Sequence, residues 1–437
     1  MFSYRSPKVL AGAAAALALL PLPVLAAPDA ETAFILNSLS FLVHGFIVML
    51  MAAGFCMLEV GLVRSKNATV QATKNIGLYS IAGLLYWLVG YNLMYADVSG
   101  YIGSFSVWSP SDASVTDAGY TGDGTDYAAS SDWFFQMVFV AAAASIVSGA
   151  VAERVKLTTF LVFSAVLTGI IYPIQGSWTW GGGWLSEMGF SDFAGSTIVH
   201  SVGGWAALVG AIMIGARQGK YLEDGSIRPI PGSNLPLATL GTFVLWFGWF
   251  GFNGGSQLAM GSAADIVAIA NIYVNTNIAA AAGVVVAIIA TLVLYKKIDL
   301  TMALNGALGG LVSITAEPLA PTPELAAFIG AVGGLLVVLT VPLLDKMKID
   351  DVVGAIPVHL VCGIWGTLAV CISGGADPVV QLTGIVAIGA FVSLASAVVW
   401  FALGAILGLR PSEEEETGGL DLSECGLDSY PDFIRQS

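Results

Sequence analysis

The chain has 437 residues, of which 56% are hydrophobic and only 11% are charged. A water-soluble fold cannot hide that share of apolar side chains, so the composition excludes a soluble protein and predicts a polytopic membrane protein. The formal net charge of −14 is carried by loops and the tail rather than by a basic surface, which argues against a nucleic-acid partner.

The first segment has the features of a signal peptide. Arg5 and Lys8 precede an Ala/Leu core, and small residues end at Ala26 where cleavage is expected. We therefore expect three parts: a signal peptide over 1–26, a transmembrane domain over 27–409 and a cytoplasmic regulatory tail over 410–437.

Hydropathy then predicts eleven transmembrane helices, because a span needs about 20 mainly apolar residues. Lys and Arg outside the signal peptide fall in every second connection, starting after the first span. The positive-inside rule therefore predicts an outer mature N-terminus and a cytoplasmic C-terminus. By this topology the acidic connection over 97–132 lies outside. Its negative charge either concentrates cations at the entrance or is simply what is left when basic residues are excluded from exported loops. The expected spans are 34–63, 76–96, 132–152, 157–178, 193–215, 235–257, 267–295, 301–316, 325–344, 352–374 and 382–409.

Two of these spans repeat one pattern in opposite directions across the membrane. Asp192 precedes His200 by eight residues, and Asp351 precedes His359 by the same eight. Eight residues of helix rise roughly 12 Å, which puts each His near the middle of a ~30 Å apolar slab. Matching sequences of opposite direction predict an inverted repeat of five plus five helices, with an eleventh helix outside it and a site near the midplane.

Ionisable side chains at that depth usually belong to a substrate or proton pathway. Burial favours neutral imidazoles, each with one donor and one acceptor nitrogen, so a facing pair can exchange a proton. The alternative is a pair of structural histidines bonded to carbonyls; their equivalent depths favour the relay. His44 has no repeat partner and is expected to be structural.

Spacing alone leaves several other residues with ordinary roles. Asp192 and Asp351 are expected to cap helices, and Asp192 could also support an outer cation site. Trp180 is expected to anchor the chain at the membrane interface, and the aromatic face that holds Phe252 and Ser256 is expected to pack against neighbouring helices. Packing is also the expected role of Phe135 and Phe139. Glu59 and Glu153 are expected to pair with Arg or Lys at the cytoplasmic interface.

Five motifs stand out along the mature chain: Asp192 through Arg217, Gly61 through Asn67, Gly149 through Arg154, Gly248 through Asn253 and Val358 through Gly363. Together they resemble the ammonium transporter (Amt/Mep/Rh) family, and the resemblance covers essentially the whole mature chain. The resemblance implies a pore in each subunit of a homotrimer. It also implies a recruitment site for ammonium made by Trp180, Ser256 and Phe139 with support from Asp192, a gate of Phe139 and Phe252, and a proton-relaying pair of His200 and His359.

The acidic tail from Glu413 to Gly426 resembles the regulatory C-terminus of that family. The resemblance implies a PII-type regulatory protein at the cytoplasmic face. Cys425 stands where the family usually has a histidine, so regulation through this tail is expected to differ in detail.

Together these features predict a multi-pass transporter of the inner, cytoplasmic membrane. It would recruit ammonium, deprotonate it and conduct ammonia, with a separate proton transfer; methylammonium is a further possible substrate. No nucleophile, metal-ligand cluster or phosphate-binding loop accompanies the histidines, so we expect neither an enzyme nor a cofactor. An Rh-like neutral gas channel is the closest alternative, against which the match at Trp180 and Ser256 favours the Amt branch. An ammonium sensor or transceptor is the other alternative and ranks well below transport.

Overall fold

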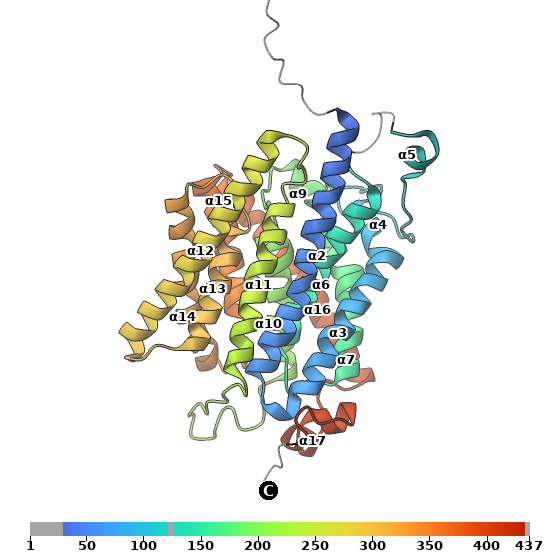
Figure 1. Ribbon diagram of the computed structural model, residues 1–437. Helices are drawn as coiled ribbons and strands as arrows, with labels where there is room; N and C mark the ends of the chain where they lie inside the picture. The colour runs from blue at the N-terminus through green and yellow to red at the C-terminus, as the bar shows by residue number, and fades with distance from the viewer. Residues whose placement is uncertain (1–28, 121–125, 433–437) are drawn as a thin grey trace, which may run out of the picture.

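The chain is seen in a computed structural model that describes residues 29–120 and 126–432. The predicted signal peptide, 1–26, lies outside the described residues. Within the described ranges the regular structure is helical, apart from an isolated antiparallel bridge between Tyr221 and Ile227. The long helices lie side by side in one bundle (Figure 1).

Ten helical segments of the described chain are long and apolar enough to cross a membrane, and a shorter apolar helix, α13 (Leu300–Ile314), brings the number to eleven. The predicted all-α polytopic fold is therefore confirmed. The ten segments are α2 (Ala30–Leu62), Ser65–Tyr95, α6 (Ala129–Ala150), Leu157–Ser177, Ser196–Ile214, α11 (Leu235–Gly255), α12 (Ala263–Tyr295), α14 (Pro323–Lys346), Ile356–Ser373 and α16 (Pro378–Ile406).

Several of these spans consist of more than one helical element. The second contains η1 (Ser65–Asn67), α3 (Ala68–Leu85), η2 (Tyr86–Gly90) and α4 (Tyr91–Tyr95). The fourth contains α7 (Leu157–Val166), η3 (Leu167–Ile171) and α8 (Tyr172–Ser177). Short helices outside the spans are α5 (Ala113–Ala118) and α9 (Trp184–Glu187).

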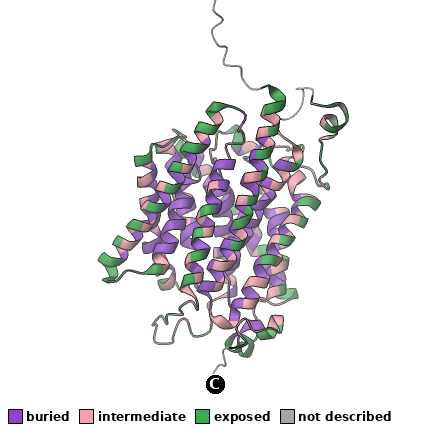
Figure 2. Cartoon of the chain, viewed as in Figure 1, coloured by how far each residue is buried: buried purple, intermediate pink, exposed green. Residues whose placement is uncertain are grey.

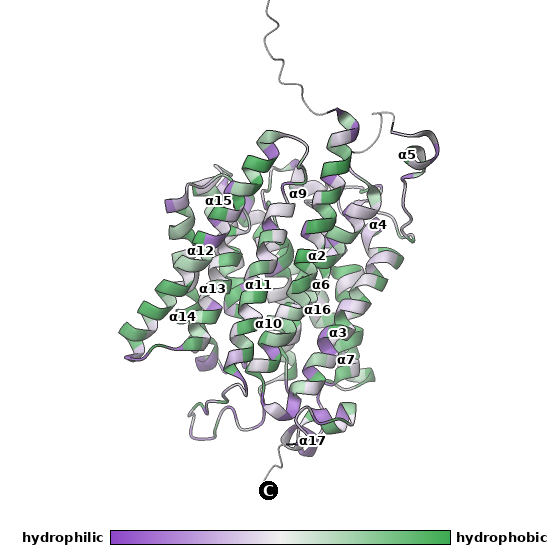
Figure 3. Cartoon of the chain, in the orientation of Figure 1, coloured by the Kyte–Doolittle hydropathy of each residue, from purple (hydrophilic) through white to green (hydrophobic). Residues whose placement is uncertain are grey.

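Apolar side chains cover the outside of the bundle as well as its inside. Phe401 and Ile406 on α16 are 73% and 77% exposed. Figure 2 shows buried residues concentrated along the middle of the bundle, and Figure 3 shows hydrophobic residues on both the inner and the outer faces of the helices. A bundle that is apolar all round is what a bilayer requires, since lipid rather than water contacts its perimeter.

The second span begins eleven residues earlier than its predicted start at 76. Gln71 and Lys74 depress the hydropathy there, but the fold buries both (1% exposed each). Lys74 Nζ donates to the Ser148 carbonyl over 2.8 Å, and Gln71 Nε2 donates to Ser148 Oγ over 3.0 Å. Gln71 Nε2 also donates to Glu59 Oε2 of α2. Hydropathy missed residues 65–75 because their polar side chains find partners in α2 and α6.

Both predicted histidine spans begin with a π-helical stretch. η4 (Ser196–Ser201) leads into α10 (Val202–Ile214), and η5 (Ile356–Val361) leads into α15 (Cys362–Ser373). Three other π-helical stretches occur in the described chain, η2, η3 and η6 (Asp421–Cys425), so the feature that the two histidine spans share is a π stretch at the start of the span. The sequence repeat is therefore matched by a repeat of local backbone geometry. The inverted arrangement of the two halves and the orientation in the membrane stay predictions.

The C-terminal segment docks on one end of the bundle, where α17 (Glu413–Gly418) lies beside the start of the second span (Figure 1). Glu416 accepts from the backbone N–H of Gln218 over 2.7 Å. Beyond α17, η6 (Asp421–Cys425) is tied to the second span, because Asp421 accepts from the Val70 N–H over 2.8 Å. The tail thus contacts the connections that carry the basic residues.

A buried ionic cluster lies at that same end. Arg217 binds Asp350 through Nε and Nη2, at 2.8 and 2.9 Å, and reaches Glu153 at 3.2 Å. Glu153 also pairs with Arg64 at 2.8 Å. The pairing predicted for Glu153 is therefore confirmed.

Candidate functional site

A cavity of about 380 Å³ opens at the end of the bundle opposite the docked tail, and it brings the three predicted recruitment residues together. We name it the outer cavity, because the predicted orientation would place it on the outer side of the membrane. Phe139 from α6, Trp180 from the connection before α9, and Ser256 at the end of α11 all line it. Ser256 Oγ donates to the Phe252 carbonyl over 2.8 Å. Its own lone pairs remain available to accept a hydrogen bond from a ligand N–H.

Two stacked rings lie at the base of this cavity: Phe139 lines it, and Phe252 packs against Phe139. The centroids of Phe139 and Phe252 are 4.0 Å apart with planes 30° from parallel, and Trp180 meets Phe139 edge-on at 6.1 Å. Phe139 and Phe252 are 1% and 0% exposed. In this conformation an ion that moves from the cavity toward the middle of the bundle would have to displace one of these two rings.

The predicted histidine pair lies directly behind the second ring. Phe252 stacks on His200 with centroids 5.1 Å apart, and His200 Nδ1 lies 3.2 Å from His359 Nδ1. A hydrogen bond between two Nδ1 atoms requires that one imidazole carries its proton there and the other does not. The two rings therefore hold different tautomers. If the donor ring takes up a proton at its Nε2, its Nδ1 proton can cross to the other ring, which then releases a proton from its own Nε2; after this sequence the two neutral rings have exchanged tautomers.

The backbone before His200 is held in place by Asp192. Its Oδ1 accepts from the N–H groups of Gly195 and Ser196, and its Oδ2 accepts from those of Thr197 and Ile198, all at 2.8–3.0 Å. Burial raises the pKa of Asp192 to about 6, although these four hydrogen bonds favour the carboxylate.

The capping role predicted for Asp192 agrees with these bonds. The residue is 4% exposed and, within the described part of the chain, is not among those that line the outer cavity. Its link to that cavity is indirect: Trp180 Nε1 donates to the Asp192 carbonyl over 3.0 Å. Any support that it gives to a cation there therefore acts through Trp180 and through its charge.

Asp351 caps the second histidine span in the same way. It accepts from the N–H groups of Gly354 and Ile356 at 3.1 and 2.7 Å. The predicted structural role of His44 also agrees with its contacts, since Nδ1 lies 2.9 Å from the Ser40 carbonyl and Nε2 lies 3.0 Å from the Tyr273 hydroxyl.

Sequence reasoning missed Trp249, which stacks on His200 at 4.9 Å and donates to Thr315 Oγ1 over 2.8 Å. Its position three residues before Phe252 puts both on one face of α11, which was the available signal.

Sequence reasoning also missed Asp132, which it treated only as one of the acidic residues of the connection over 97–132. It is 7% exposed, lines the outer cavity, and accepts hydrogen bonds from the Tyr91 hydroxyl and from Gln136 Nε2. Its spacing from Gln136 and Phe139 places all three on one face of α6, and this spacing could have revealed it.

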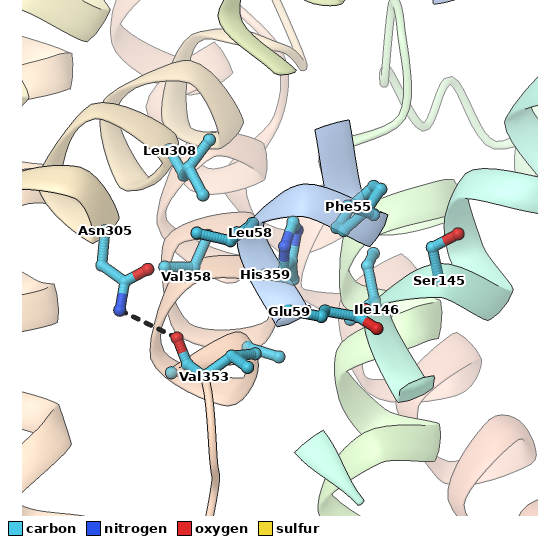
Figure 4. A pocket seen from close by; sticks show the side chains of 12 residues that line it. Phe55, Leu58, Glu59, Ser145, Ile146, Asn305, Leu308, Val353, Val358 and His359 are labelled. Atoms are coloured by element: carbon cyan, nitrogen blue, oxygen red, sulfur yellow. Dashed lines mark hydrogen bonds between the residues drawn. The ribbon is translucent and has the colours of Figure 1, made fainter. Parts of the chain in front are cut away.

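Beyond His359 the path continues into a cavity of about 10 Å³, which has room for roughly one water molecule. Figure 4 shows His359 and Glu59 among the side chains that surround it. Asn305, Val353 and Gly354 line both this cavity and a larger one of about 500 Å³ next to Asp351. The column of aromatic rings and histidines thus has a continuation toward the end of the bundle that carries the tail.

The pairing predicted for Glu59 at the interface is wrong. The side chain is 0% exposed and is bound by amide and hydroxyl groups rather than by an Arg or Lys head group: Asn75 Nδ2 donates to Oε2 over 2.7 Å, and Ser148 Oγ donates to it over 2.8 Å. Lys74 acts on Glu59 through its charge, but its Nζ donates a hydrogen bond to the Ser148 carbonyl instead of to Glu59.

Comparisons with known proteins agree with this architecture. Residues 39–430 match the Ammonium Transporter Family. The ammonium transporter Amt2 of Archaeoglobus fulgidus is 42% identical over 425 residues, covering 90% of this chain and 88% of the relative. The ammonium transporter Amt1 of Haloferax mediterranei is 39% identical, covering 92% of this chain and 80% of the relative. A solved structure named Sensor Amt Protein superposes with a TM-score of 0.83 at 37% identity, covering 90% of this chain and 99% of that one. The chain therefore belongs to the ammonium transporter family and is a multi-pass membrane transporter rather than an enzyme.

Proposed function

We propose that this transporter binds ammonium in the outer cavity, removes one proton there and conducts ammonia past the histidine pair. Three features support recruitment by Trp180, Phe139 and Ser256. Aromatic faces attract a cation, Trp most strongly. The serine hydroxyl can accept from ammonium, which is a donor only. Asp192 assists because its backbone carbonyl accepts the hydrogen bond from Trp180 Nε1 and so helps to hold the indole ring in place.

The stacked rings of Phe139 and Phe252 act as the gate. Neutral ammonia can cross an apolar constriction far more readily than an ion, because a bare charge loses its solvation there. Amines of this type have pKa near 10, so neutralisation at pH 7 costs about 4 kcal/mol before solvation is counted. Potassium has no proton to give up, so the same gate rejects it. Selectivity then comes from chemistry rather than from size.

His200 and His359 carry the released proton. The observation that supports this proposal most is the 3.2 Å contact between their Nδ1 atoms, at the end of an otherwise apolar aromatic column. Exchange of a proton along that contact needs little movement of either ring. If the proton crosses with ammonia, transport moves one net charge per ammonium.

Orientation and partners complete the proposal. The chain lies in the lipid bilayer of the cell membrane with the outer cavity facing out and the tail in the cytoplasm, which agrees with the positive-inside distribution of Lys and Arg. Family resemblance supports a homotrimer, and the tail docked beside Val70 and Gln218 offers a surface for a PII-type protein. Methylammonium is a further expected substrate.

The first test is the current on solid-supported membranes after an ammonium jump, with potassium and protein-free vesicles as controls. A saturable current with ammonium and none with potassium is expected. The double variant H200A/H359A should lose the current, and full ammonium current in that variant would refute the relay.

The second candidate is an ammonium sensor, favoured by the likeness to a solved structure that is named as one. Saturable ammonium binding by calorimetry, with neither a current nor facilitated alkalinisation of the vesicle interior, would favour the sensor. Alkalinisation without current would favour the neutral gas channel.

A further inference from the structure

Glu59 is a buried carboxyl for which the proposed relay has no role. It lies on α2, is 0% exposed, and lines the small cavity that His359 also lines (Figure 4). Burying a carboxylate is costly, so a fold that keeps one usually satisfies both of its oxygens.

The two oxygens of Glu59 are treated very differently. Oε2 accepts from Gln71 Nε2, from Asn75 Nδ2 over 2.7 Å and from Ser148 Oγ over 2.8 Å. Oε1 is buried and has no hydrogen-bond partner among the described residues. The hydrogen bonds therefore fix one oxygen of Glu59 and leave the other without a protein donor among the described residues.

The unpartnered oxygen lies near a wall of the cavity. A methyl group built on Gly149 would meet Oε1 at 3.3 Å and the Val353 side chain at 2.5 Å, and Val353 is part of the cavity wall. Glu59, Val353 and His359 all line this space, which holds roughly one water molecule. The donors from α3 and α6 anchor Oε2 and so fix the position of Oε1 beside Val353.

Lys74 supplies a nearby positive charge without occupying Oε1. Its Nζ donates to the Ser148 carbonyl over 2.8 Å and lies 4.8 Å above the Phe160 ring, while Ser148 Oγ bonds Glu59. The charged group that acts on Glu59 is Lys74 from α3, and Arg154 acts in turn on Lys74. His359 from η5 lines the same small cavity and would add a positive charge there when protonated. The carboxylate is stabilised by charge but remains free to accept a proton.

We propose that Glu59 Oε1 is the proton acceptor on the inner side of the histidine pair, an inference that rests on the proposed relay. When His359 holds an extra proton, one of its N–H bonds breaks and a water molecule in the small cavity passes a proton on. An O–H bond forms on Oε1, which leaves His359 neutral and Glu59 as the uncharged acid. The acid then releases this proton toward the larger cavity, through the shared wall of Asn305, Val353 and Gly354, and returns to the carboxylate.

The test uses the full-length chain in proteoliposomes, with two readouts from the same preparation: ammonium current, and an internal pH dye that follows ammonia conduction. E59Q keeps the shape of the side chain but cannot carry the proton in this way. Its current should fall by about tenfold or more, as expected for loss of an acid–base group, while dye-reported ammonia conduction persists. E59D keeps a carboxyl and should retain part of the current.

The charge-balanced variant E59Q/K74M separates a proton acceptor from a partner that only neutralises Lys74. It also guards against a single variant that fails to fold because Lys74 is left unpaired. If Glu59 carries protons, the double variant stays as low in current as E59Q. Recovery of the current in the double variant, or a current in E59Q close to that of the wild type, would overturn the inference.

A readout on the unaltered protein does not depend on the folding of any variant. Infrared difference spectra under ammonium perfusion should show a protonated-carboxyl band in the wild type, and its absence would count against Glu59. A wild type with no ammonium current at all would refute the proposed function first, whereas a normal wild-type current with an unaffected E59Q refutes only the role of Glu59.

Discussion

Arg217→Gln should destabilise the transporter through one identifiable group, Asp350. Arg217 is 3% exposed in its side chain and makes three hydrogen bonds to the carboxylate, from its backbone N–H, Nε and Nη2, at 2.8–2.9 Å. The variant keeps the backbone bond and loses the two charged ones. Asp350 is left as a buried carboxylate without its main partner.

The expected size follows from the surroundings. Removing one partner of a buried ion pair usually costs about 3–5 kcal/mol. Glu153 keeps Arg64 at 2.8 Å, and Asp350 keeps the field of Arg154, so the lower end of that range, about 3 kcal/mol, is expected. Lys220→Gln is the matched control. Its pair with Asp345 is partly exposed, at 11% and 27%, and should contribute about 1 kcal/mol or less.

The contribution of Asp350 to stability should depend on pH in opposite directions in the wild type and in Arg217→Gln. In the wild type, burial alone would raise the pKa of Asp350, but Arg217 and Arg154 outweigh it and hold that pKa well below its usual range. A depressed pKa gives stability that is present above the unfolded value, near 3.9, and is lost as the pH falls below it.

In the variant, burial is opposed only by the charge of Arg154 and by the remaining backbone bond, so the pKa of Asp350 should rise, and we expect it to pass the unfolded value near 3.9. In the variant, Asp350 then contributes favourably to the free energy of unfolding at low pH, and this contribution is lost as the pH rises. Acidification from neutral pH toward about pH 4 should therefore shrink the deficit of the variant without helping the wild type.

The assay is thermal unfolding in detergent, followed by Trp fluorescence at several pH values. The double variant R217Q/D350N should regain most of the lost stability, since the unpaired charge is gone. A variant as stable as the wild type at neutral pH, or a deficit that does not change on acidification, would refute this reasoning.

Three further predictions concern the pathway. Gly195→Ala should lower both thermal stability and ammonium current, because Gly195 has φ of 107° and a Cβ there would meet Val199 Cγ2 at 2.5 Å; the strain should cost about 1–3 kcal/mol, and an unchanged unfolding midpoint would contradict this. Asp132→Asn should raise the ammonium concentration for half-maximal current and spare the maximum, since it removes negative charge from the outer cavity wall; an unshifted titration would argue against a role in attracting the cation. Phe252→Ala removes one of the two rings stacked at 4.0 Å and should admit a potassium current absent from the wild type; continued silence to potassium would show that the gate lies elsewhere.

The order and type of the helices could be read from the sequence alone. A bilayer imposes one length and one composition on every span, so the hydropathy of each segment is a local property. The repeated spacing of Asp192 with His200 and of Asp351 with His359 was equally local, and each pair does lie within one continuous stretch of cap and π-helix. The motifs that carried the family resemblance supplied the roles of the aromatic residues, which spacing alone did not.

Only the tertiary structure decided which side chains meet across helices. The early start of the second span depends on acceptors from α2 and α6 that hydropathy does not register. Trp249 and Asp132 became site residues because α11 and α6 turn them toward His200 and the outer cavity. For Glu59, sequence could show an acid near the end of a span. Its three donors on one oxygen, and the cavity that Glu59 shares with His359, exist only once α2, α3, α6 and η5 have packed together. Hydrogen bonding and burial are set by neighbours distant in the chain.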